Sequence, residues 1–116
     1  MAALLILGLF LARAAPAAAH AFLDHADPRV GSTVAAAPPA LTLVFTEPVE
    51  PTFSRVALTR GDGTAVATGE IVHPAPATLR VALPPLAPGT YTVSWAVVSI
   101  DTHPTEGRFT FTVRGP

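Results

Sequence analysis

The sequence has no cysteine and no lysine, and only one methionine, among its 116 residues. Without cysteine the chain cannot form a disulfide scaffold, a catalytic thiol, a zinc finger or an iron–sulfur cluster. Seven arginines and eight acidic residues give a formal net charge of −1, and the basic residues do not cluster. Because nucleic acids and anionic membranes are bound mainly through basic patches, we expect no nucleic-acid partner.

Long apolar runs are also missing, apart from one N-terminal segment. Residues 1–19 contain 16 hydrophobic residues, but the apolar run Ala2–Ala12 is too short to span a bilayer. A basic residue, a proline and three alanines follow, which is typical of a secretory signal peptide, with an uncleaved membrane anchor as the alternative. Cleavage after Ala19 would leave residues 20–116 as one exported, periplasmic or extracellular domain that begins with His20.

Beyond residue 19 the chain consists of short alternating runs separated by proline, glycine and aspartate, with no sustained helical periodicity. Twelve prolines in this part also argue against long helices. The pattern predicts an all-β domain, either a Greek-key β-barrel or an immunoglobulin-like sandwich of about seven strands. The predicted strands are Ala21–Asp27, Leu41–Thr46, Ser54–Thr59, Ala65–Ala67, Thr78–Leu83, Tyr91–Ser99 and Arg108–Val113.

The same alternation predicts the core, because successive side chains of a strand face opposite sides of the sheet. We expect nearly all aromatic side chains to pack in this core, and Trp95 to be a buried tryptophan rather than a platform for ligands. The predicted core residues are Leu41, Leu43, Phe45, Val56, Leu58, Leu79, Val81, Leu83, Val93, Trp95, Val97, Phe109, Phe111 and Val113.

Two of the four histidines have neighbours that predict a metal site. His20, once exposed by cleavage, would offer its α-amine and Nδ1 to one metal ion and close a six-membered chelate ring. Asp101 and His103 are two residues apart, so in an extended strand both side chains face the same side and can converge on one ion. Pro104 favours this backbone, because proline disfavours the helical region for the residue before it. We therefore predict a metal site made by His20, Asp101 and His103.

The predicted ligands favour Cu(II), with one ion per chain. Two nitrogens from His20, one from His103 and an oxygen from Asp101 suit tetragonal Cu(II), and zinc is the nearest competitor. Cu(I) prefers thioether or thiolate ligands, and residues 20–116 contain neither methionine nor cysteine. Storage of Cu(I) is therefore not expected.

Other polar residues have simpler interpretations. We interpret His25 as a surface histidine, with an auxiliary ligand as the alternative, and His73 as a loop residue. Glu47 and Glu106 are either solvated charges or acceptors for imidazole N–H groups. No nucleophile elbow and no glycosidase-type pair of carboxylates is recognisable, so we expect no enzyme. A small copper-brace oxidase or monooxygenase and a metal-free immunoglobulin-like structural module remain the alternatives.

Essentially all of residues 20–116 resembles the CopC family of periplasmic copper-binding proteins. The features that carry the resemblance are the start His20-Ala21 with Pro28 and Gly31, the segment Phe45-Thr46-Glu47-Pro48-Val49-Glu50, and a C-terminal block with Tyr91, Val93, Trp95, Ser99, Asp101, His103, Gly107, Phe109, Phe111 and Val113. The resemblance implies a Greek-key β-barrel, export, and a Cu(II) site at His20, Asp101 and His103.

The sequence departs from the family pattern in two places. Some members carry a methionine-rich loop that binds Cu(I), whereas this chain has Phe53-Ser54-Arg55 after Pro51 and no methionine after residue 1. Thr102 stands where the family often has glycine.

Family members often occur beside a CopD-type inner-membrane copper permease. We therefore expect a monomeric protein that sequesters Cu(II) or delivers it to a separate permease of that type.

Overall fold

The computed structural model describes residues 20–115. The signal peptide predicted for residues 1–19 lies outside the described residues. No helix among the described residues is long and apolar enough to cross a membrane.

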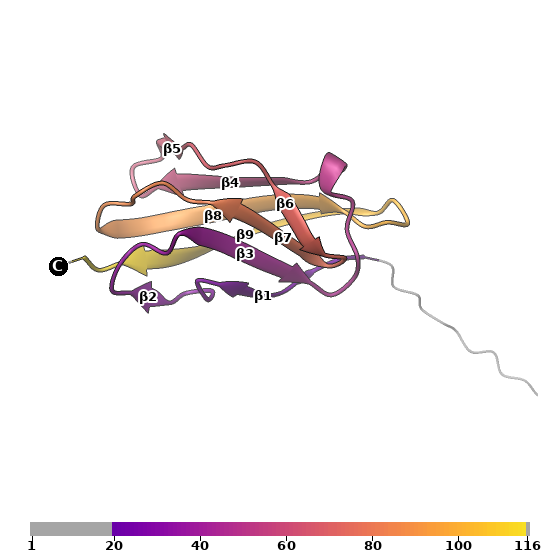
Figure 1. The fold of residues 1–116 in the computed structure, drawn as a ribbon, viewed down its shortest axis with the longest axis horizontal. Helices are drawn as coiled ribbons and strands as arrows, with labels where there is room; N and C mark the ends of the chain where they lie inside the picture. Colours follow the sequence, from indigo (N-terminus) through magenta and orange to yellow (C-terminus); the bar gives the residue numbers. More distant parts are fainter. Residues whose placement is uncertain (1–19, 116) are drawn as a thin grey trace, which may run out of the picture.

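Two β-sheets pack face to face in a sandwich (Figure 1). The four-stranded sheet has the order β1 (Leu23–Asp27), β3 (Ala40–Phe45), β7 (Thr78–Ala82) and β6 (Val72–Ala75). The five-stranded sheet has the order β2 (Thr33–Val34), β9 (Pro104–Val113), β8 (Gly89–Val98), β4 (Arg55–Arg60) and β5 (Ala65–Val66). A single turn of 3₁₀ helix, η1 (Pro51–Phe53), precedes β4. The predicted all-β class is confirmed.

The strand count is higher than predicted: residues 20–115 form nine strands rather than about seven. β2 has two residues and no apolar alternation, so nothing local marks it. β6 contains Pro74, which cannot donate to a ladder, and the fold tolerates it because β6 is an edge strand. The prediction that His73 lies in a loop was therefore wrong, since His73 belongs to β6. The last strand, β9, begins at Pro104 rather than Arg108.

The core follows the period-two pattern of the strands. Every predicted core residue is buried except Val56 and Leu83, which are partly buried and pack against the core. The Trp95 and Phe45 rings meet edge to face with centroids 5.2 Å apart, as expected for a buried tryptophan. Gly107 makes room for the indole, because a Cβ at this position would lie 2.6 Å from Trp95 Cζ2.

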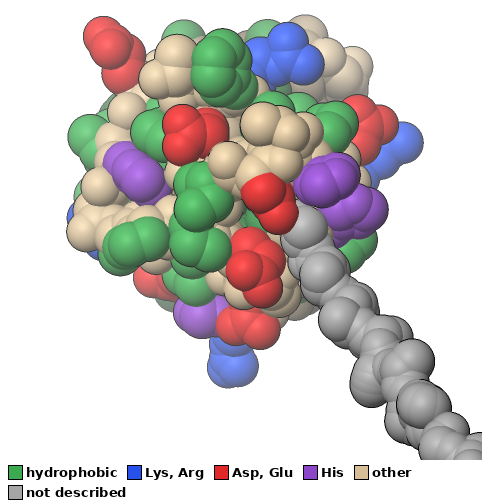
Figure 2. Space-filling model, turned by 90° about the vertical axis from the view of Figure 1, so that its right-hand side faces the viewer, with side chains coloured by type: hydrophobic (Ala, Val, Ile, Leu, Met, Phe, Trp, Pro, Cys, Tyr) green, Lys and Arg blue, Asp and Glu red, His purple; other side chains and the backbone are tan. Residues whose placement is uncertain are grey.

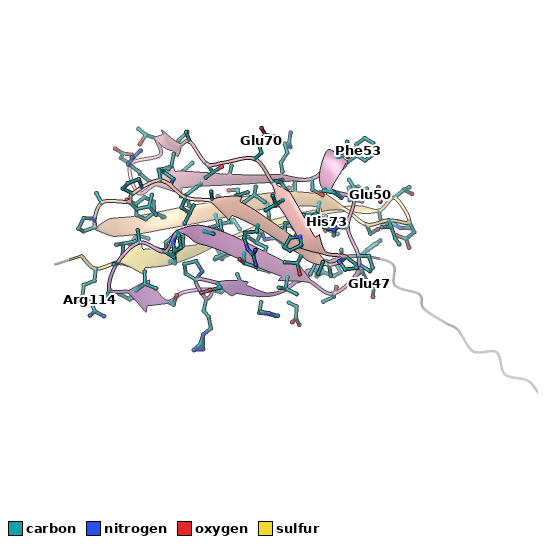
Figure 3. All side chains as sticks on the ribbon, in the orientation of Figure 1. Glu47, Glu50, Phe53, Glu70, His73 and Arg114 are labelled. Carbon is teal, nitrogen blue, oxygen red and sulfur yellow. The ribbon has the colours of Figure 1, made fainter. Side chains whose placement is uncertain are left out.

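Two aromatic side chains do not follow the core prediction. Phe22 is 54% exposed and Phe53 is 68% exposed. Phe53 lies in η1, outside the alternation of the strands, which is why a period-two argument does not place it correctly. Figure 3 shows Phe53 near the same end of the sandwich as Glu47 and Glu50, with Arg114 at the opposite end.

The β8–β9 hairpin is the framework for the candidate site. Its ladder runs from Gly89 opposite Val113 to Val98 opposite Pro104. Figure 1 shows the turn of this hairpin at the same end of the sandwich as the start of the described chain. The predicted ligands Asp101 and His103 lie in that turn, and His20 lies at that start.

Candidate metal centre

The turn between β8 and β9, residues 99–103, closes a tight loop of three residues, 100–102, that ends in the left-handed Thr102. Thr102 N–H donates to Ser99 O at 2.8 Å, and Ser99 N–H donates to His103 O at 3.0 Å. Thr102 has a φ of +73°. A β-turn followed by a left-handed residue is a common three-residue hairpin connection. The prediction that Asp101 and His103 share one face of an extended strand was therefore wrong, because the chain reverses direction between β8 and β9.

The turn nevertheless brings the two predicted side chains together. Asp101 Oδ1 lies 3.4 Å from His103 Nδ1, and each side chain is about half exposed. The carboxylate and the imidazole are thus neighbours at the surface, accessible from solvent. Their proximity comes from the curvature of the loop and from the hydrogen bonds that fix it.

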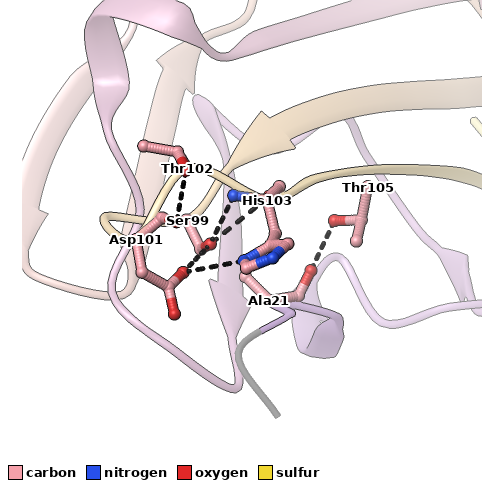
Figure 4. A network of polar contacts seen from close by, with 6 residues as sticks. All are labelled: Ala21, Ser99, Asp101, Thr102, His103 and Thr105. Atoms are coloured by element: carbon pink, nitrogen blue, oxygen red, sulfur yellow. Dashed lines mark hydrogen bonds and ion pairs between the residues drawn. The ribbon is translucent and has the colours of Figure 1, made fainter. Parts of the chain in front are cut away.

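Ser99 is the buried centre of this loop (Figure 4). Its side chain is 1% exposed, and its hydroxyl donates to Asp101 Oδ1 at 2.5 Å. Ser99 Oγ also accepts a hydrogen bond from the backbone N–H of His103 at 3.1 Å. The Ser99 hydrogen bond is the main cause that lowers the pKa of Asp101 below its ordinary value, with a further lowering from His103. The Asp101 carboxylate is therefore ionised at neutral pH.

His20 lies against His103, although 83 positions separate them in the sequence. The two imidazole centroids are 4.8 Å apart, and the Phe22 ring lies 6.0 Å from the His20 ring. Two segments distant in the sequence, the start of the described chain and the β8–β9 turn, thus contribute to one end of the sandwich. Figure 2 looks onto this end and shows acidic side chains across it, with histidine side chains at separate places around them.

Two hydroxyl groups hold the N-terminal segment in place. Thr105 Oγ1 on β9 donates to the carbonyl of the fully buried Ala21 at 2.6 Å. Thr46 Oγ1, after β3, accepts the backbone N–H of Phe22 at 3.0 Å, and Thr46 N–H donates to Phe22 O at 2.8 Å. These bonds anchor the residues directly after His20 and so keep its side chain near the hairpin.

The contacts at the site are pairwise. His20 meets His103, and His103 meets Asp101. Within residues 20–115, no group of three histidine or acidic side chains is arranged to hold a metal ion by itself.

The chain matches the family model of the CopC domain over residues 23–114, which is most of its length. The chain belongs to the CopC family. It is 40% identical to protein YobA of Escherichia coli K12 over 99 residues, which cover 83% of this chain and 80% of that protein.

Solved structures of CopC relatives have the same fold. The crystal structure of CopC from Methylosinus trichosporium OB3b superposes with a TM-score of 0.79 at 36% identity, covering 83% of this chain and 95% of the other. PcoC, a methionine-rich copper resistance protein from Escherichia coli, superposes with a TM-score of 0.76 at 36% identity, covering 83% and 100%. The resemblance to CopC proteins inferred from the sequence is confirmed.

Other histidines of this CopC-family chain make separate contacts. His25 Nδ1 bonds Asp24 Oδ2 at 2.7 Å on β1, and its side chain is 63% exposed, as expected for a surface histidine. His73 Nε2 lies 3.0 Å from Pro76 O. Neither histidine pairs with His20 or His103 in the described contacts.

The residues that sequence reasoning missed are the hydroxyl groups that hold the site. Ser99, Thr46 and Thr105 carry no metal-ligand signature, and their roles depend on contacts across the fold. One signal was available for Ser99: it continues the alternating buried row of β8 that contains Val97.

Replacement of Thr102 by glycine is expected to raise the stability of this CopC domain by about 1 kcal/mol. A non-glycine residue in the left-handed region is strained by about 1–3 kcal/mol, part of which is offset by the greater chain entropy of unfolded glycine. Thermal unfolding should show a rise of roughly 4–8 °C. Thr110→Gly, in the exposed row of β9, is the control and should lower stability. A Thr102→Gly variant that is less stable than the parent would contradict the strain argument.

Proposed function

We propose that this CopC-family chain is an exported copper-binding protein, and that its mature form begins at His20. In this form one Cu(II) ion is held by the α-amine and imidazole of His20 together with Asp101 and His103. The observation that carries the proposal is the 4.8 Å approach of the His20 and His103 rings, with Asp101 beside His103. The α-amine that cleavage would release is the fourth donor of the proposed site.

The chemistry of these donors supports Cu(II) over Cu(I). Amine, imidazole and carboxylate are donors that Cu(II) accepts in tetragonal geometry, whereas Cu(I) prefers soft sulfur ligands. PcoC is named as methionine-rich, but this chain has no methionine after residue 1. We therefore propose a site for the oxidised ion only, with zinc as the main competitor.

The proposed role is sequestration of copper or its delivery to a separate CopD-type permease in the inner membrane. Family membership supports a copper-handling role, since PcoC is described as a copper resistance protein. The relatives compared above are not named for an enzymatic activity, and the function is proposed as binding without catalysis. The half-exposed ligands suit this role, because cargo must be taken up and released. The protein acts as a monomer in this proposal.

Electron paramagnetic resonance of the Cu(II)-loaded protein that begins at His20 tests the proposal. We expect saturation at one ion per chain and hyperfine structure from nitrogen ligands. Binding of more than one ion with equal strength, or a spectrum with oxygen ligands alone, would contradict the proposed site.

A Zn(II) competition titration measures the preference of the site for Cu(II) over Zn(II). Cu(II) should bind more tightly, because it has the highest affinity in the first-row series.

Acidification is expected to weaken Cu(II) binding steeply between about pH 8 and pH 5. The imidazoles and the α-amine must be deprotonated to bind, so copper competes with protons for each nitrogen. Asp101 contributes little to this loss, because its lowered pKa keeps the carboxylate ionised throughout the range. Isothermal titration at several pH values measures the slope. A flat profile would argue against nitrogen ligands.

A further inference from the structure

We propose that Ser99 is the positioning residue of the copper site. This inference rests on the proposed function. Ser99 touches no metal in this scheme, but its hydroxyl holds the carboxylate of Asp101 and the backbone of His103 in one fixed arrangement. No other side chain among the described residues bonds to both of these residues.

The geometry gives the single Ser99 hydroxyl two tasks at once. Its proton goes to Asp101 Oδ1, which at 2.5 Å is closer than the alternative acceptor, the His103 carbonyl, at 3.3 Å. Its oxygen lone pair receives the His103 N–H at 3.1 Å. The hydroxyl thus bonds to the carboxylate of Asp101 and to the backbone of His103. It is almost completely buried beneath these two residues.

Removal of this hydroxyl would take one hydrogen bond from the Asp101 carboxylate and one from the His103 backbone, without removing either ligand. The Asp101 side chain is half exposed, so without the Ser99 bond it can rotate into solvent. Binding of copper would then have to restrict that motion, which costs affinity. Hydrogen-bond partners behind metal ligands typically contribute about 10–100-fold to metal affinity.

The chain offers a matched control in Ser54. Ser54 is also a buried serine, 6% exposed, and its hydroxyl donates to a backbone carbonyl, that of Glu50, at 2.7 Å. Ser54→Ala removes a buried hydroxyl and its hydrogen bond but touches neither Asp101 nor His103. A general loss of stability would affect both variants, whereas a positioning role affects only Ser99→Ala.

The test is a Cu(II) titration of the protein that begins at His20, with a double-mutant cycle between Ser99 and Asp101. We expect Ser99→Ala to weaken Cu(II) binding at least about 10-fold and Ser54→Ala to change it less than about twofold. In the Asp101→Ala background, Ser99→Ala should cost less than about threefold, because part of its effect passes through Asp101. Ser99→Thr retains the hydroxyl and should bind within about threefold of the parent.

A second readout needs no copper. In the metal-free protein the His103 amide donates to Ser99 Oγ, so its hydrogen exchange should accelerate in Ser99→Ala and remain slow in Ser54→Ala. Equal copper affinities of Ser99→Ala and the parent, with Asp101→Ala weakened, would overturn the positioning role alone. Equal costs of Ser99→Ala in both backgrounds would also overturn it. Unchanged binding in Asp101→Ala would instead overturn the proposed ligand set and the Ser99 proposal with it.

Discussion

One residue added before His20 is expected to lower the Cu(II) affinity of the mature chain by more than about 100-fold, because loss of a direct ligand exceeds the usual effect of its hydrogen-bond partners. An added methionine converts the α-amine of His20 into an amide nitrogen, which is not an amine donor at neutral pH. The chelate ring between this nitrogen and Nδ1 is then lost. The imidazole of His20 remains and the new α-amine lies on the added residue, so the experiment tests whether an α-amine on His20 itself is required.

The structure makes this comparison clean. Ala21 and Phe22 are held by Thr105 and Thr46, so an extra residue before His20 leaves these anchoring bonds in place. Isothermal titration with Cu(II) measures the difference, and thermal unfolding of the metal-free forms checks that both are folded. A methionine added after Pro116, at the other terminus, is the matched control and should leave the affinity unchanged. Equal affinities of the two N-terminal forms would refute the chelate.

Replacement of His103 by alanine is expected to have a similarly large effect, again more than about 100-fold on Cu(II) affinity. His103 is the central residue of the site. Its ring centroid lies 4.8 Å from that of His20, and its Nδ1 lies 3.4 Å from Asp101 Oδ1. Its removal therefore takes away one nitrogen donor and separates the two other ligands. Asp101→Ala removes one oxygen donor but leaves every nitrogen donor in place, so it should weaken binding less than His103→Ala.

His25→Ala is the control for this series. His25 is an exposed histidine that bonds Asp24 on β1, so its removal deletes the same type of side chain without touching the site. We expect its Cu(II) affinity to equal that of the parent, and its nitrogen hyperfine pattern to be unchanged. In His103→Ala the pattern should lose one nitrogen. A larger loss of affinity in His25→Ala than in His103→Ala would show that His25, rather than His103, is the copper ligand.

The strands and the core could be predicted because their signal is local. Apolar side chains in β3, β8 and β9 alternate with polar ones, and burial of one face of a strand needs only this period of two. Trp95 was correctly placed in the core on the same evidence. The short edge strands β2 and β6 were missed because pairing with a distant strand, rather than their own sequence, makes them strands.

The residues predicted for the site lie close together, but the geometric reason given for Asp101 and His103 was wrong. Asp101 and His103 meet in a hairpin turn with a left-handed Thr102, not on one face of a strand. The i, i+2 argument assumed that the strand continues through residue 103. It could not account for the hydrogen bonds of Ser99, which close the loop and reverse the chain.

The sequence by itself determined which donor atoms this protein can offer. It contains no thiol, no thioether after residue 1, and few histidines, so the chemistry of any metal site was limited before the fold was known. Only the tertiary structure decided which of these donors meet. His20 reaches His103 because a hydrogen bond from Thr105 to Ala21 joins residues 84 positions apart, and the β8–β9 hairpin presents its turn at the same end. Such contacts depend on the packing of the two sheets, which no local pattern in the sequence specifies.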